Sequence, residues 1–192
     1  MAAISESLLE TYTASDALAL AGLVKRGEVS PAELVEAAIT TIERLNPSLN
    51  AVVHRLYDMA RAQAATVDKN APFAGVPYLV KELASSWKGA PNTNSCFYLK
   101  DFVADSDSEV VRRIKAAGLV LVGKSNAPEN GWSITTEPKL YGTTRNPWKA
   151  SRRAAPAAAA PPRSLRAWCR SPKPATAPAR SVCPRPAAAS SG

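Results

Sequence analysis

Apolar positions in the first part of the chain recur first at helical spacing. Leucine, alanine and valine repeat with that period across Asp16–Arg26, and Gly27 stands where a C-terminal helix cap belongs. The segment Ser30-Pro-Ala-Glu33 then offers an N-cap serine, a proline at the first helical position and a glutamate that can close a capping box. We predict a second helix from here to about Leu45, ended by Asn46-Pro47.

Short apolar runs of strand type follow these helices. Asn50-Ala-Val-Val-His54 reads as a short strand, and a helix is expected through Ala60 and Ala64. Gly75-Val-Pro-Tyr-Leu-Val-Lys-Glu-Leu83 has the character of a buried strand entered through a turn.

The same alternation is repeated further along the chain. Ser106-Asp-Ser-Glu109 suggests a capping box that opens a helix ending at Gly118, and the apolar strand Leu119-Val-Leu-Val122 follows directly. Helices that alternate with apolar strands predict an α/β fold whose sheet is largely covered by helices.

The composition changes after Ala150. Residues 151–192 contain no Asp, Glu, Ile, Phe, Tyr, Asn or Gln, and consist almost entirely of Ala, Pro, Arg and Ser. Such a segment cannot bury a core, and its prolines interrupt any helix. We therefore divide the chain into residues 1–150, expected to fold, and residues 151–192, expected to be a disordered Ala/Pro/Arg-rich tail.

The net charge of +8 comes entirely from this tail, because acidic and basic residues balance in the first 150 positions. A basic disordered arm could bind an anionic partner, so one hypothesis is a non-catalytic interaction domain carrying such an arm. Against nucleic acid as the partner, the tail has a single aromatic residue, Trp168, for base stacking. A regulatory fragment of a longer relative is a further alternative.

The remaining features narrow the classes of function. The N-terminus has acidic residues where a signal peptide needs positive charge, and no apolar run approaches a bilayer span, so we expect a cytoplasmic protein without a membrane partner. Cys96, Cys169 and Cys183 fit no metal-ligand spacing and are read as free thiols. His54 is the only histidine, which argues against a histidine-based triad or a histidine-rich metal site.

Three segments, in this order and spacing, resemble the amidase signature family: Gly75-Val-Pro-Tyr-Leu-Val-Lys-Glu82, Gly118-Leu-Val-Leu-Val-Gly-Lys-Ser-Asn-Ala-Pro-Glu129 and Tyr141-Gly-Thr-Thr-Arg-Asn-Pro-Trp148. The resemblance extends from about residue 15 to residue 150. Within the family, Thr135–Pro138 and Gly142–Trp148 are most similar to the subgroup that hydrolyses the cyclic dimer of 6-aminohexanoate. The resemblance implies a mixed sheet covered by helices, here truncated, and hydrolysis of carbon–nitrogen bonds in small cyclic or linear amides, without a cofactor or metal.

Members of this family use a Ser-Ser-Lys triad, and by motif position its lysine is Lys81. In a strand, Lys81 and Glu82 point to opposite faces, so the nearest carboxylate is not placed to neutralise the lysine. The alternative is that Lys81 merely ends the strand and extends to water. The resemblance further implies that five residues support the site, namely Lys124, Asn126, Glu129, Arg145 and Asn146. The oligomeric state stays open.

The two serines of the triad are missing, because the glycine/serine-rich segments that follow in the family are absent after Trp148. A shift of the reading frame could have removed these segments. To test for it, each codon of the alternative frame is built from the last base of one residue's codon and the first two bases of the next residue's codon. By this rule Ala154–Arg163 permits Gly-Gly-Ser-Ser-Gly-Gly-Ser-Ala-Ala-Ala, and Ala177–Pro186 permits Gly-Ala-Gly-Ser-Val-Arg-Val-Pro-Ala-Ala. We interpret the tail as the product of a frameshift near codons 150 to 152, which leaves this chain without a nucleophile and inactive.

Overall fold

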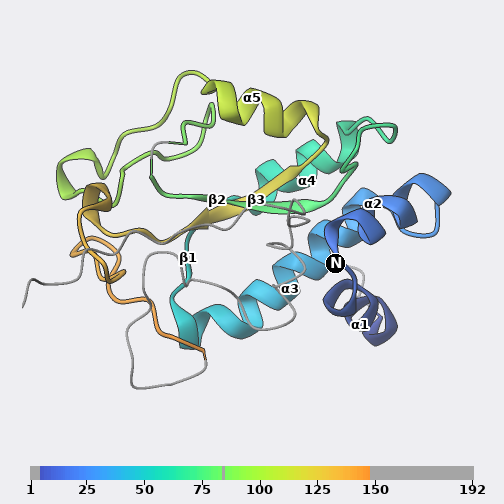
Figure 1. Ribbon diagram of the computed structural model, residues 1–192, viewed down its shortest axis with the longest axis horizontal. Helices are drawn as coiled ribbons and strands as arrows, with labels where there is room; N and C mark the ends of the chain where they lie inside the picture. Colours follow the sequence, from blue (N-terminus) through green and yellow to red (C-terminus); the bar gives the residue numbers. More distant parts are fainter. Residues whose placement is uncertain (1–4, 84, 148–192) are drawn as a thin grey trace, which may run out of the picture.

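A computed structural model describes residues 5–83 and 85–147 of the 192-residue chain, as a small sheet with helices on both sides (Figure 1). The sheet has three strands, β1 (Val52–Arg55), β2 (Pro77–Lys81) and β3 (Val120–Ser125), in the order β1-β3-β2. β2 runs parallel to β3 and β1 runs antiparallel to it. The expected α/β fold with a mixed sheet is confirmed, whereas the predicted tail, residues 151–192, lies outside the described residues.

The helices flank this sheet on two sides. On one side lie α1 (Glu6–Ala14), α2 (Ala17–Arg26) and α3 (Pro31–Leu49), and on the other lies α5 (Glu109–Ala116) (Figure 1). α4 (Tyr57–Thr66) packs against both α3 and β3. Two short 3-10 turns, η1 (Phe97–Leu99) and η2 (Glu129–Gly131), belong to the loops beyond the strands. None of the helices in the described part is both long and apolar enough to cross a bilayer.

Local capping signals place the starts of α2 and α3 where they were predicted. The Asp16 side chain accepts a hydrogen bond from the Ala19 N–H, and Gly27 adopts the left-handed conformation at the C-terminus of α2. Ser30 and Glu33 form the expected capping box at the start of α3. Helix α1, capped by Ser5, was not predicted.

The predicted end of the second helix was wrong, because α3 continues through Pro47 to Leu49. The proline sits in the last turn, where it removes one intrahelical hydrogen bond. Asn46 offsets this loss: its side-chain oxygen accepts the N–H groups of Ala51 and Val52, each at 2.8 Å, and its amide donates to the Val52 carbonyl. The helix then closes with Asn50 in the left-handed conformation.

The start of α5 also differs from the prediction. The helix begins at Glu109 with Ser108 as its N-cap residue, so the capping box predicted at Ser106 was wrong. The Ser106 hydroxyl donates to Asp105 instead. The Asp107 carboxylate accepts from the Lys88 backbone N–H and from Lys115, and these long-range contacts place the chain ahead of the helix.

The sheet separates two apolar clusters. The larger one joins α1, α2 and α3 with residues such as Val52, Val120 and Val122, and the smaller one joins Val80 and Leu121 with Trp87. Successive strand residues contribute to opposite clusters, as the alternation of side chains in a strand requires.

Gly123 lies where the register of β3 shifts against β2, close to a second shift, against β1, at Lys124 and Ser125. The pairing shifts between Tyr78 and Leu79 on β2 and between Val52 and His54 on β1. A Cβ atom at Gly123 would lie 2.5 Å from the His54 carbonyl oxygen, so only glycine allows this close approach. Lys124 and Ser125, the polar residues that follow Gly123 at the end of β3, lie at the candidate site.

Candidate active site

Lys81 is the last residue of β2, at the carboxyl end of the parallel strand pair. Its side chain is half-buried, and it pairs in register with Ser125, the last residue of β3. Glu82 follows at once and is completely buried on the other side of the strand. No carboxylate among residues 5–83 and 85–147 forms an ion pair with the Lys81 amine.

The carboxylate of Glu82 is instead committed to Lys124. Both side chains are completely buried, and Nζ of Lys124 lies 2.9 Å from Oε2 of Glu82. The Lys124 ammonium also donates to the Pro91 carbonyl at 2.5 Å and to Oδ1 of Asn92 at 3.1 Å. Lys124 therefore joins the sheet to the loop around residues 91 and 92.

The second oxygen of Glu82 fastens the same loop. Oε1 accepts the Thr93 backbone N–H at 2.5 Å and the Thr93 hydroxyl at 2.9 Å. His54 Nε2, from β1, lies 3.5 Å from this oxygen. Burial alone would raise the pKa of Glu82, but the His54 hydrogen bond, the Lys124 charge and the Thr93 N–H together lower it to about 2. Glu82 is thus ionised throughout the neutral range.

Two further shifts describe the electrostatics of this cluster. Burial lowers the pKa of Lys124, and the Glu82 charge opposes that effect. Burial likewise raises the pKa of Tyr141; the Thr93 hydrogen bond works against this rise, and the Glu82 charge adds to it. The cluster therefore holds one buried ion pair and a neutral phenol.

Tyr141 links the cluster to the last described loop. Its hydroxyl lies 2.8 Å from Nε2 of His54 and 2.7 Å from the Thr93 hydroxyl. The His54 and Tyr141 rings meet edge to face, with centroids 5.2 Å apart. β1, β2, β3 and two loops thus converge on one polar cluster, which consists of His54, Glu82, Thr93, Lys124 and Tyr141.

Asn126 holds the loop of residues 141–147 against the strand ends. Its side-chain amide donates to the Gly142 carbonyl at 3.0 Å and to the Thr144 hydroxyl at 2.9 Å. The Arg145 backbone N–H donates to Leu49 at the end of α3, while its side chain is exposed and Asn146 is half-buried. Of the proposed supporting residues, Asn126 therefore holds this loop against the strand ends, and the Arg145 backbone joins the loop to the end of α3.

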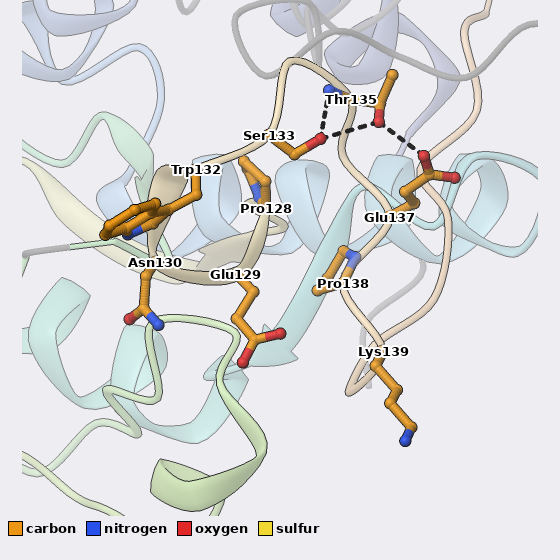
Figure 2. Close-up of a pocket in the computed structure, with 9 residues that line it drawn as sticks. All are labelled: Pro128, Glu129, Asn130, Trp132, Ser133, Thr135, Glu137, Pro138 and Lys139. Carbon is orange, nitrogen blue, oxygen red and sulfur yellow. Dashed lines mark hydrogen bonds between the residues drawn. The ribbon is translucent and has the colours of Figure 1, made fainter.

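Glu129 lies apart from the buried cluster, at a surface cavity of about 500 Å³ beyond the end of β3. Figure 2 shows Glu129 and Lys139 extending in the same direction from the two chain segments that line this cavity. At its other end the Ser133 hydroxyl, the Thr135 hydroxyl and the Glu137 carboxylate form a short hydrogen-bonded chain. Trp132, which also lines the cavity, is 90% exposed.

The sequence analysis did not single out four members of the cluster as site residues, namely His54, Glu82, Thr93 and Tyr141. One signal was available: Val80 and Glu82 occupy alternate positions of an apolar strand, so a charge on that face needed a buried partner. Within the described part of the chain, no group of three or more His, Cys, Asp or Glu side chains could hold a metal ion. In the cluster the Lys124 ammonium and the Glu82 carboxylate instead form an ion pair with each other.

Comparisons with known proteins agree with this geometry. A family model described as Amidase matches residues 33–155. The 6-aminohexanoate-cyclic-dimer hydrolase of Paenarthrobacter ureafaciens is 46% identical over 139 residues, which are 71% of this chain and 28% of that protein. A lipoamidase of Enterococcus faecalis is 42% identical over 138 residues, 71% of this chain and 19% of that protein.

A solved structure agrees as well. A 6-aminohexanoate cyclic dimer hydrolase matches with a TM-score of 0.72 and 43% identity, over 79% of this chain and 32% of that chain. The resemblance read from the sequence is confirmed. The chain spans less than a third of the length of these relatives.

Proposed function

This chain belongs to the amidase family, and from that membership we propose that it carries the lysine part of an amide-hydrolysing site, with Lys81 as the proton-transferring group. One observation carries the proposal. Lys81 ends a parallel strand without a carboxylate partner in the described part, because the adjacent Glu82 is bound to Lys124. An amine that no carboxylate fixes as ammonium can accept and return a proton.

The buried ion pair supports this role of Lys81 by its position. Glu82 is next to Lys81 in sequence and would otherwise be the nearest counter-ion. Because Lys124 and Thr93 bind both of its oxygens on the opposite face of β2, the carboxylate is held away from Lys81. Lys124 is in this account a residue that supports the site, as are Asn126, Glu129, Arg145 and Asn146.

The relatives indicate the substrate class that we propose. One is named for hydrolysis of the cyclic dimer of 6-aminohexanoate, and another is a lipoamidase. We therefore assign small cyclic or linear amides as substrates of the complete site. The chemistry needs protein groups and water, so we propose no cofactor.

The present chain supplies only one member of a Ser-Ser-Lys triad in this proposal. After Trp148 the sequence has no glycine-rich segment that could present a serine nucleophile and donate to an oxyanion. In the alternative reading frame the nucleophile would align with Arg180. We propose that residues 151–192 are the product of a frameshift and that the chain as given does not hydrolyse amides.

A chimera tests the role of Lys81. Residues 1–147 replace the matching N-terminal segment of the Paenarthrobacter hydrolase, and hydrolysis of the cyclic dimer is followed by release of the linear product. The chimera should be active, and Lys81→Met should lower kcat by about 10²- to 10⁴-fold, the usual contribution of a general acid–base group. Lys69→Met, which removes an exposed lysine outside the candidate site, is the matched control. Full activity of the folded Lys81→Met chimera would refute the proposal.

A further inference from the structure

The Thr93 hydroxyl fixes the direction of the hydrogen bonds in the polar cluster. It lies 2.9 Å from Oε1 of Glu82, and because an ionised carboxylate can only accept, Thr93 donates its single proton there. The Thr93 oxygen also accepts the Ser95 backbone N–H at 3.1 Å. One lone pair of this oxygen is left, so the Tyr141 hydroxyl, 2.7 Å away, must be a donor to Thr93.

The direction of this bond in turn decides the state of the His54 ring. A phenol has one proton, and because Tyr141 gives it to Thr93, the Tyr141 oxygen is an acceptor towards Nε2 of His54, 2.8 Å away. Nε2 must therefore carry a hydrogen. The position of Glu82 agrees with this, since its Oε1 lies 3.5 Å from the same nitrogen and would repel a bare lone pair there.

The donors thus follow one another in a single direction, in the order His54, Tyr141, Thr93 and Glu82. An imidazole with hydrogen on Nε2 and an imidazolium both donate from that nitrogen, so protonation of His54 does not reverse the order. His54 lies on β1, whereas Tyr141 is the first residue of the loop of residues 141–147. The bond between them therefore attaches the start of this loop to the sheet.

We propose that His54 is a positioning residue of the active site, which fixes the loop of residues 141–147 by donating a hydrogen bond from Nε2 to the Tyr141 hydroxyl. This rests on the proposed function, because the serine-bearing segments of the complete site follow directly after this loop in the family. His54 acts through Tyr141 and not on the substrate. The position of the loop sets where those serines enter the site.

The state of His54 is measured by ¹⁵N NMR of the full 192-residue chain, in which the only histidine gives one pair of imidazole signals. In mildly alkaline solution, Nε2 should have the chemical shift of a hydrogen-bearing nitrogen and Nδ1 that of a bare one. Tyr141→Phe removes the acceptor and should move both signals towards the averaged values of free histidine. The matched control Tyr57→Phe, which removes a hydroxyl bonded to Glu43, should leave them unchanged.

Amide hydrogen exchange in two variants measures the effect of His54 on the loop. The reporting amides are Gly142, bonded to the Pro138 carbonyl, and Thr144, bonded to the Thr136 carbonyl. His54→Leu removes the donor, so both amides should exchange about 5-fold faster, as expected for the loss of one hydrogen bond. His54→Gln offers an amide N–H near the place of Nε2 and should restore the original rates. Amides in the middle of α3 should exchange equally in all three proteins.

The chimera adds a kinetic measurement. There His54→Leu should lower kcat about 10-fold with little change in KM, because a shifted loop misplaces the reacting groups, and His54→Gln should restore it.

Three results overturn the role of His54: a bare Nε2, loop amides that exchange equally fast in His54→Leu, or exchange raised as much in α3 as in the loop. A chimera that needs Lys81 but is unaffected by His54→Leu also overturns this role, and it leaves the proposed function standing. A chimera that is inactive with either residue at position 54 refutes the proposed function and, with it, the role of His54.

Discussion

Nζ of Lys124 and Oε2 of Glu82 lie 2.9 Å apart, and both side chains are completely buried. The two residues belong to adjacent strands but are far apart in sequence, and each also binds the loop of residues 91–93. This one pair therefore ties β2, β3 and the loop together next to Lys81. Its removal should have consequences for both the fold and the site.

Breaking the pair from one side should be strongly destabilising. Lys124→Met leaves an unpaired carboxylate in the interior, and we expect the free energy of unfolding to fall by about 3–5 kcal/mol. The double variant Lys124→Met with Glu82→Gln removes both charges and should recover part of that loss. Urea unfolding followed by circular dichroism measures both values. A loss below about 1 kcal/mol for Lys124→Met would contradict a dry, buried pair.

The pKa of Glu82 makes a prediction about acid stability. Its pKa of about 2 in the folded chain is below that of an unfolded glutamate, so its ionisation stabilises the fold above about pH 4.5. This contribution should be lost as the pH falls from about 4.5 towards 2, and it amounts to about 3 kcal/mol.

Unfolding free energies of the unmodified chain and of Glu82→Gln, measured between pH 5 and 2, isolate this effect from other carboxylates. The difference between the two proteins should shrink towards acid pH. A difference that stays constant over this range would show that Glu82 titrates normally.

Gly123 should not tolerate a side chain. A Cβ atom there would lie 2.5 Å from the His54 carbonyl and 3.0 Å from a Val52 methyl group, so Gly123→Ala must push β1 and β3 apart. We expect a loss of about 1–3 kcal/mol. Gly22→Ala is the matched control: it lies within α2, where alanine favours the helix, and its Cβ would meet only the flexible end of Arg26. Equal thermal stability of both variants would argue against the close approach at Gly123.

The Asn46 side chain should contribute more to the free energy of unfolding than is usual for a residue near a helix end. Its side chain makes three hydrogen bonds to the backbone of Ala51 and Val52, and Asn46→Ala would leave the buried Val52 groups and the part-buried Ala51 N–H without these partners. We expect a loss of about 2–3 kcal/mol. Ser48→Ala, which removes one exposed hydrogen bond in the same turn, should cost below about 1 kcal/mol. Denaturant unfolding of the two variants checks this order.

What could be predicted from the sequence depended on how local the determining contacts are. The starts of α2 and α3 follow from Asp16, Ser30 and Glu33, whose bonds reach only three residues along the chain. The end of α3 could not be found in this way, because Asn46 bonds to the segment after the helix. The start of α5 was missed for a similar reason, since Asp107 binds the distant Lys88 backbone.

In the site, too, only the features that depend on residues close in sequence could be predicted. Lys81 was predicted from its motif and its role stays a prediction, whereas strand alternation correctly placed Glu82 on the opposite face. The partner of Glu82 was not, because the register shift at Gly123 decides which face Lys124 occupies. Tyr141 and His54 are 87 residues apart, and only the folded chain brings them within hydrogen-bonding distance of each other.

The most direct test of the whole account is the rate of cyclic-dimer hydrolysis by the product of this gene after one base is inserted near codons 150 to 152 to enter the alternative frame. The account predicts that the given chain is inactive, that the frame-restored protein hydrolyses the amide, and that Lys81→Met lowers its kcat by about 10²- to 10⁴-fold. A folded, frame-restored protein that does not hydrolyse amides, or one that does so equally well without Lys81, would contradict it.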